Sequence, residues 1–152
     1  MPFSKIDLVD CLLLKELAGR ARAPFQELGR RLHLSAAQVQ ERVQRLEENG
    51  FICRYTTELV PEALGYSLQA IVQIRPMPGR MKPVEKLIEG TPEIVECDKV
   101  SGDDYFIARL FARSMKHLDS IVERLATDAT ISTAITVKGQ IIRRRPPPVE
   151  PM

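Results

Sequence analysis

Side chains that can hydrogen-bond to nucleic-acid bases are concentrated between residues 35 and 45. An arginine can pair with guanine or phosphate, a glutamine with adenine, and a glutamate can accept a hydrogen bond from cytosine. All three types occur here beside small residues that permit close approach, and the candidate contact set is Ser35, Ala37, Gln38, Glu41, Arg42 and Arg45. The chemistry of this set is therefore that of a surface able to read DNA.

A helix must position these side chains, and its ends are marked in the sequence. Ser35 followed by Gln38 is typical of a capping box, and Gly50 suits the left-handed residue that ends a helix. The apolar positions that we expect to face inward are Ala36, Val39, Val43 and Leu46. The candidate set then lies on the outer face, at the N-terminal half that a groove-reading helix presents to bases. A charged outer face is also what a helix exposed only to solvent presents.

Two further helices precede this one. Apolar residues at a spacing near 3.6 predict a helix from residue 6 to residue 19, and Pro24 suits the start of a second, which reaches about residue 32. A short connection at His33-Leu34 then joins the second helix to the third. This pattern predicts a helix-turn-helix, winged-helix-like unit, although such a helical pair can also be purely structural.

The second half of the sequence changes its periodicity. Residues 68–75 alternate as in a strand with two unlike faces, and strands are also expected at 94–100, 105–111 and 131–142. Helices are expected at 83–89 and after Ser114, which can cap a helix. The resulting order, β-α-β-β-α-β, predicts a ferredoxin-like fold, so that the whole chain is of the α+β class.

Four segments follow from this pattern. Residues 1–50 form the helix-turn-helix domain, 51–66 a strand (51–59) and linker, 67–142 the ferredoxin-like domain, and 143–152 a basic, proline-rich tail. The net charge of the 152-residue chain is only +2, so any positive charge that attracts DNA must be local.

The composition narrows the class of protein further. No apolar run approaches the roughly 20 residues of a membrane span, and no secretion signal is recognisable. The three cysteines lie far apart, without the spacing of a metal site or a disulfide framework. We therefore expect a cytoplasmic protein with no cofactor, no metal and no membrane partner.

The order of motifs resembles that of the Lrp/AsnC, or feast/famine, transcriptional regulators of bacteria and archaea. The resemblance covers about residues 4–142. It is carried by Ile6-Asp7-Leu8-Val9-Asp10, Gly19-Arg20, Glu27-Leu28-Gly29-Arg30-Arg31, Leu34-Ser35, Val39, Arg42-Val43, Arg45-Leu46-Glu47-Glu48, Gly50-Phe51-Ile52, Leu64-Gly65 and Val100-Ser101-Gly102-Asp103-Asp104-Tyr105-Phe106. Three positions depart from the family pattern. His33 stands where Gly is frequent, Gly29 where Ala is usual, and Ile135 where Thr is frequent.

The resemblance implies a second domain, called RAM, that pairs with a copy of itself and binds small molecules, commonly amino acids, where dimers meet. The effector-binding residues that it implies are Ser101, Gly102, Asp103, Asp104, Tyr105 and, on the last strand, Thr133. An aspartate can accept from the ammonium group of an amino acid, and a glycine turn exposes backbone N–H groups to its carboxylate. A Gly-Asp-Asp sequence also fits an ordinary hairpin turn.

A four-stranded sheet backed by two helices leaves its other face bare. Ile71, with Val95 or Cys97 and with Ile107 or Phe111, is expected to form an apolar patch there. A second copy would cover this patch, so we expect a homodimer that assembles further, to an octamer or a similar oligomer.

The sequence thus predicts a sequence-specific DNA-binding transcriptional regulator that responds to a small effector, an amino acid, and is not an enzyme. Two alternatives remain open. One is an enzyme of tetrapyrrole biosynthesis similar to the siroheme decarboxylases, which resemble this family in both halves, although the chain has only His33 and His117 to offer as catalytic histidines. The other is a ligand-binding oligomer that does not bind DNA.

Overall fold

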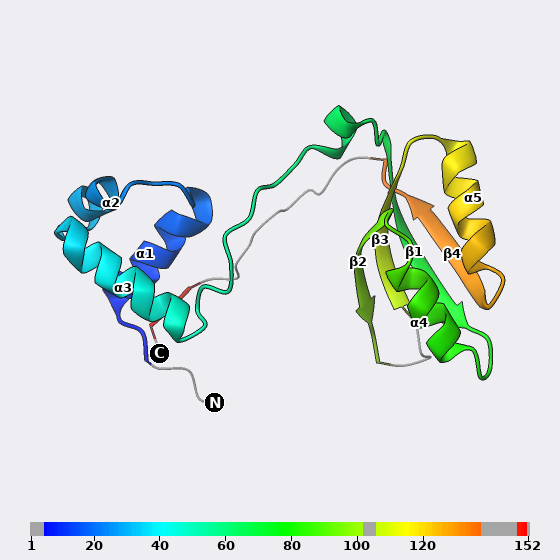
Figure 1. Cartoon of the computed structure of the whole chain (residues 1–152), viewed down its shortest axis with the longest axis horizontal. Coiled ribbons are helices and arrows are strands. Elements are labelled where there is room, and N and C mark those ends of the chain that lie inside the picture. The colour runs from blue at the N-terminus through cyan, green and yellow to red at the C-terminus, as the bar shows by residue number, and fades with distance from the viewer. Residues whose placement is uncertain (1–4, 102–105, 138–148, 152) are drawn as a thin grey trace. The chain divides into compact units, whose positions relative to one another are not determined.

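The computed structural model of the protein describes residues 5–101, 106–137 and 149–151. The chain folds into two compact units (Figure 1). The first comprises residues 1–57 together with 142–152, and the second comprises residues 58–141. Across the described ranges, every helix is too short or too polar to cross a membrane.

Three helices build the first unit: α1 (Leu8–Gly19), α2 (Phe25–Leu32) and α3 (Ala36–Glu48). The expected capping box of Ser35 and Gln38 begins α3, and a second one, formed by Asp7 and Asp10, begins α1. The apolar faces of the helices meet in a core of eight buried side chains: Ile6, Cys11, Leu13, Leu17, Leu28, Val39, Val43 and Leu46.

The turn between α2 and α3 contains two departures from the family pattern, and it explains the one at Gly29. His33 adopts a left-handed conformation with φ 57°, which suits the glycine frequent at this position and strains a residue with a Cβ atom. At Gly29, an added Cβ would lie 2.5 Å from the carbonyl oxygen of Leu34. The turn is thus closed so tightly against α2 that the alanine usual at this position in the family would force the backbone to move.

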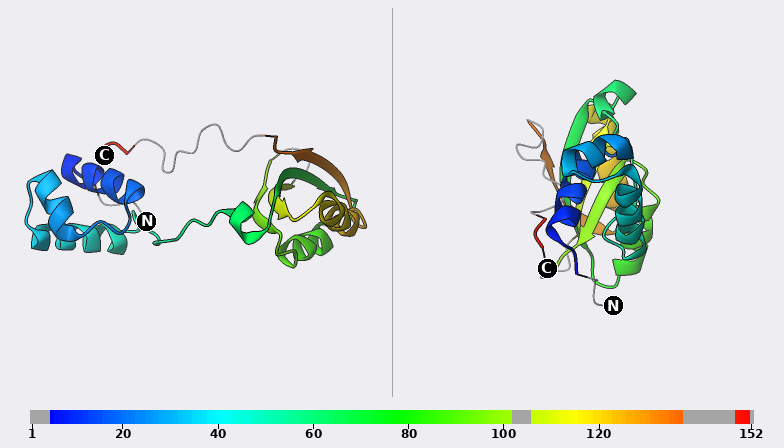
Figure 2. Two further views of the ribbon diagram at one scale, coloured as in Figure 1. Left: turned by 90° about the horizontal axis from the view of Figure 1, so that it is seen from above. Right: turned by 90° about the vertical axis from the view of Figure 1, so that its left-hand side faces the viewer.

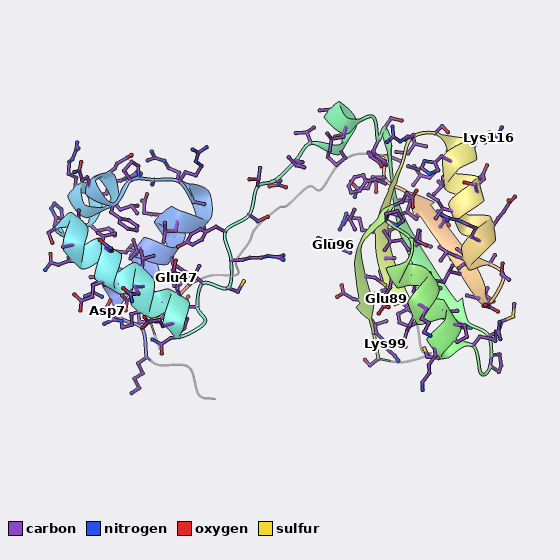
Figure 3. All side chains as sticks on the ribbon, in the orientation of Figure 1. Asp7, Glu47, Glu89, Glu96, Lys99 and Lys116 are labelled. Carbon is purple, nitrogen blue, oxygen red and sulfur yellow. The ribbon has the colours of Figure 1, made fainter. Side chains whose placement is uncertain are left out.

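The segment after α3 corrects one expectation. Gly50 ends the helix with φ 75°, as its position predicted, but residues 51–60 form no strand. A strand needs a neighbouring backbone to pair with, and the described part of the chain offers none to the expected strand at 51–59. Instead, Phe51 and Ile52 pack against the helical core, and the Tyr55 hydroxyl donates to Glu47 on α3 (2.7 Å; Glu47 is labelled in Figure 3). Burial and this bond raise the pKa of Tyr55 to about 12.

The second unit has the expected order of elements. After a short 3-10 helix, η1 (Pro61–Leu64), come β1 (Leu68–Pro76), α4 (Met81–Glu89), β2 (Ile94–Lys99), β3 (Phe106–Ala112), α5 (Met115–Leu125) and β4 (Ala129–Ile135). The strands lie in the order β2-β3-β1-β4, all antiparallel, as in a ferredoxin-like fold. Both helices pack on one face of this sheet (Figure 2). Thirteen buried side chains form the core there.

Two details of the sheet differ from the expectation. β4 ends at Ile135 because Thr136 N makes its last bond, to Gln69 O (2.8 Å), at the point where β1 begins. The expected positions 138–142 of this strand lie outside the described residues. In β2, a shift of register between Ile94 and Glu96 places Cys97 opposite Ala108, on the core side of the sheet. Cys97 is therefore excluded from the bare face.

Candidate functional site

The N-terminal turns of α3 carry the most exposed part of the candidate DNA-contacting set. Ser35, Ala37, Gln38 and Glu41 are all exposed. Two hydrogen bonds close the capping box, from Ser35 N to Gln38 Oε1 (2.9 Å) and from Gln38 N to Ser35 Oγ (3.1 Å). Pairing of Gln38 with adenine uses both its amide oxygen and its amide nitrogen. The cap and such a contact therefore compete for the same oxygen atom.

The two arginines of the set lie in a different environment, against the start of α1. Arg42 Nη1 donates to Asp7 Oδ2 (2.8 Å) and to Asp10 Oδ1 (2.7 Å). Arg45 Nη2 donates to both carboxylate oxygens of Asp10, at 3.0 Å each. The Asp10 side chain is only 2% exposed, against 24% for Arg42 and 52% for Arg45. A buried carboxylate on α1 thus holds two guanidinium groups of α3.

This ion network combines with the cap of α1. Asp10 N donates to Asp7 Oδ1 (2.7 Å), and Asp7 N donates to Asp10 Oδ2 (3.2 Å). The backbone bond from Asp10, and then Arg42, lower the pKa of Asp7, while bonding to Asp7 and Asp10 raises the pKa of Arg42. Figure 3 shows Asp7 beside α3. The arginines therefore fix α3 against α1.

Sequence reasoning missed the two aspartates as partners of the arginines. Both belong to the motif Ile6-Asp7-Leu8-Val9-Asp10, and their spacing of three is that of a capping box. That spacing was the available signal for the cap. No local pattern indicated that Arg42 and Arg45, which follow Asp10 by 32 and 35 positions, would cover its side chain.

Other basic residues of the first unit divide into paired and unpaired groups. Arg20 is held by Glu27 (2.6 Å) and Arg31 by Glu16 (2.8 Å). Among the residues that the structure describes, Arg22, Arg30 and Arg54 are exposed and make no ion pair. These three side chains keep their full positive charge available for phosphate.

The predicted effector residues are only partly within the described chain. Gly102, Asp103, Asp104 and Tyr105 lie outside it. Ser101 is exposed just after β2, and Thr133 is exposed on β4, opposite Val72 of β1. β2 and β4 are the two edges of the sheet, so the two sites lie about 14 Å apart at the usual strand spacing. One chain therefore does not bring Ser101 and Thr133 into a single pocket.

The face of the sheet opposite the helices is mixed in character. Ile71, Ile107 and Phe111 lie there, as the alternation of β1 and β3 predicted, and Ile107 is 38% exposed. Between them runs the ion pair of Arg109 with Glu96 (3.1 Å), the latter labelled in Figure 3. Across the described ranges, no cluster of His, Cys, Asp and Glu has the make-up of a metal site.

Comparison with known proteins assigns each half of the chain to a domain family. Residues 6–47 match the AsnC-type helix-turn-helix domain, and residues 69–145 match the Lrp/AsnC ligand binding domain. The HTH-type transcriptional regulator LrpA of Mycobacterium tuberculosis is 33% identical over 133 residues, which are 87% of this chain and 89% of that protein.

Solved structures agree with this assignment. Bacillus subtilis LrpC superposes with a TM-score of 0.85 at 26% identity, over 92% of this chain and all of that one. The regulator NMB0573 of Neisseria meningitidis, solved as a complex with L-Met, shares the fold with a TM-score of 0.85 at 21% identity, over 94% of this chain and 96% of that one. The curated relatives are transcriptional regulators, which leaves the alternative of a siroheme decarboxylase-like enzyme without support. The chain therefore belongs to the Lrp/AsnC family of DNA-binding transcriptional regulators.

Proposed function

We propose that the protein reads specific DNA sequences with the N-terminal half of α3 and adjusts this binding in response to an amino acid. The observation that carries the DNA part is the exposure of Ala37, Gln38 and Glu41 beside one another on a capped helix. Ala37 permits close approach to a groove, while Gln38 and Glu41 supply the groups that distinguish bases. Ser35 holds the first turn of the helix, because its hydroxyl accepts from Gln38 N.

The two arginines have different parts in this proposal. Arg42, three-quarters buried and bound to two carboxylates, mainly orients α3 against α1. Arg45 is half-exposed and uses Nη2 on Asp10, so the rest of its guanidinium group faces a DNA backbone or base edge. Arg30 and Arg22, both exposed, add phosphate contacts that carry no sequence information.

Salt dependence of DNA binding tests this division. Each protein–phosphate contact lowers the slope of log affinity against log salt by about 0.9. We expect Arg30→Ala to make the slope less steep by about 0.9, the value of one phosphate contact. Arg42→Ala should weaken binding and leave the slope unchanged. Lys15 is an exposed cation on α1, and Lys15→Ala is the control, for which we expect the wild-type slope. A loss of slope for Arg42→Ala equal to that of Arg30→Ala would assign Arg42 to phosphate instead.

Sequence reading has its own test, because affinity alone does not distinguish it. Selection of duplexes from a random pool by the wild type should enrich one motif. Gln38→Ala should relax one base position, by about 1–3 kcal/mol of discrimination. An identical motif for wild type and variant would remove Gln38 from the reading set.

The amino-acid effector is supported by the match of residues 69–145 to a ligand binding domain and by the L-Met complex of the meningococcal neighbour. The effector residues that we propose are Ser101, Gly102, Asp103, Asp104, Tyr105 and Thr133. Because Ser101 and Thr133 lie at opposite edges of one sheet, a site that uses both requires residues of two copies. Binding of the effector would then depend on how copies associate.

Association is proposed to begin on the bare face of the sheet. Ile71, Ile107 and Phe111 lose their contact with water if a second copy covers them, which favours a dimer, and the dimer presents two α3 helices to a pseudo-palindromic site. Further pairing of dimers through the edge strands gives the larger oligomer. Ile107→Asp should shift the dimer to monomer in sedimentation, and an unchanged mass would remove this face from the interface.

The effector proposal is tested by calorimetric titration with the twenty amino acids in turn. We expect at least one to bind the wild type, and Asp104→Ala to abolish that heat while the circular dichroism spectrum is unchanged. Thr133→Val keeps the size of the side chain but removes its hydroxyl, so it tests whether the edge strand β4 contributes to effector binding. Binding that survives both substitutions would place the effector elsewhere.

A further inference from the structure

The C-terminal segment is part of the DNA-binding unit although the whole second unit separates the two in sequence. Residues 142–152 cluster with residues 1–57, and Val149 packs, half-buried, against the hydrophobic core of α1–α3. The neighbouring Glu150 and Pro151 are exposed, so among the described residues 149–151 the contact is made by Val149.

The residues around Val149 favour its docking. Val149 is the one aliphatic residue among the ten from 143 to 152 other than the final Met152, and it follows three successive prolines. Prolines restrict the unfolded chain, so less conformational entropy is lost when the residue after them docks.

The core that receives Val149 has a reason to accept it. Only eight side chains are buried in this core, and partly buried residues complete it at its borders, among them Phe51 and Ile52 after α3. So few buried side chains leave part of the apolar surface open to water, and burial of further apolar area there is stabilising.

We propose that the segment carrying Val149 is an intramolecular docking element that closes the core of the DNA-binding unit. The chain then crosses between the two units twice, once between α3 and η1 and once between β4 and Val149. The unit that reads DNA is therefore linked along the chain to both ends of the effector unit. This proposal does not depend on which effector is bound.

Hydrogen exchange of the full chain tests the docking, because α1 and α3 can be compared with α5 in the same molecule. Val149→Asp places a charge in the contact and should raise exchange of the α1 and α3 amides about fivefold, the effect of exposing a partly buried valine. Exchange in α5 should stay unchanged.

Two matched variants complete the experiment. A chain that ends at residue 148 should behave as Val149→Asp does, while Glu150→Gln, which alters an exposed neighbour, should exchange as the wild type. Val149→Ile, which keeps an apolar side chain, should preserve protection. Wild-type exchange in α1 and α3 for both Val149→Asp and the shortened chain would overturn the proposal.

Discussion

The DNA-binding unit and the effector unit are held together by different interactions. The first buries eight apolar side chains and one carboxylate, Asp10, which receives two arginines. The second buries thirteen apolar side chains, and its one buried polar residue in the described ranges is Thr91, whose hydroxyl donates to Leu87 O (2.7 Å). Among the described residues, the charged residue buried as a whole is thus Asp10, in the unit that must orient a helix. In the unit with the larger core, the Glu93 carboxylate is partly buried, with 16% of its side chain exposed, and lies 3.2 Å from His117 Nε2.

The two kinds of interaction restrict the positions of the helices to different degrees. Apolar burial is non-directional and scales with area, so the effector unit tolerates small shifts of its helices. An ion network is directional, and breaking it leaves a buried charge without a partner. Asp10 therefore contributes to the orientation of α3 as well as to stability.

The largest effect is expected in the core of the effector unit. Leu110 is fully buried on the inner strand β3. Its replacement by alanine should lower the free energy of unfolding by about 3 kcal/mol. Chemical denaturation should measure this loss of unfolding free energy. Hydrogen exchange should show that the lost protection is confined to β1, β3 and α5. Val137→Ala, at a fully exposed position, is the control and should change nothing. Equal destabilisation of α1–α3 would mean that the two units unfold as one.

The next effect is expected at the ion network. Asp10→Ala should cost about 2 kcal/mol, because Arg42 and Arg45 lose their carboxylate while water still reaches them. The matched control is Glu41→Ala, an exposed acid on α3, for which we expect less than about 0.5 kcal/mol. Hydrogen exchange of the α1 amides measures the change in stability for both variants. If the two variants were alike, the network would contribute nothing beyond a surface ion pair.

The tight turn between α2 and α3 gives a smaller effect. Gly29→Ala should destabilise the DNA-binding unit by about 1.5 kcal/mol, because the new Cβ overlaps the Leu34 carbonyl. Gly19→Ala, with no atom within 4 Å of its Cβ, should leave stability unchanged or raise it. The thermal midpoint of α1–α3 should therefore fall for Gly29→Ala and not for Gly19→Ala, and an equal fall for both variants would contradict the steric explanation.

The smallest effect is a gain. His33→Gly should stabilise the same unit by about 0.5 kcal/mol, since glycine relieves the left-handed strain but loses more entropy on folding. His33→Ala keeps the Cβ atom and the strain, so it should give no gain. A gain of equal size for alanine would show that the imidazole itself, rather than the backbone conformation, is unfavourable.

Features set by neighbouring residues were predictable from the sequence. The Ser35–Gln38 cap, the left-handed Gly50 and the buried Ala70, Val72 and Ile74 of β1 all follow from local spacing, and all are confirmed. Local spacing was less informative on α1, which carries apolar residues on more than one side. Leu12 is 40% exposed, while its neighbour Cys11 is buried.

Features that depend on distant chain segments were not predictable. The strand expected at 51–59 has suitable residues but no partner within the chain, and the register shift in β2 turns Cys97 to the core. In the candidate site, the sequence located the exposed residues of α3 but not the pairing of Arg42 with Asp10, 32 residues away. Spacing along a helix tells which face a side chain is on, not which charge from another helix will meet it.

The division of the DNA-binding unit in sequence has a consequence for how the protein is made. Residues 1–57 leave the ribosome first and can form α1–α3 at once, yet the segment with Val149 emerges only after the entire effector unit. The nascent helices must therefore persist with an incomplete core while about ninety further residues, 58 to 149, are translated at roughly 5–20 per second. A helical unit stabilised early by its own caps and ion network is suited to that interval.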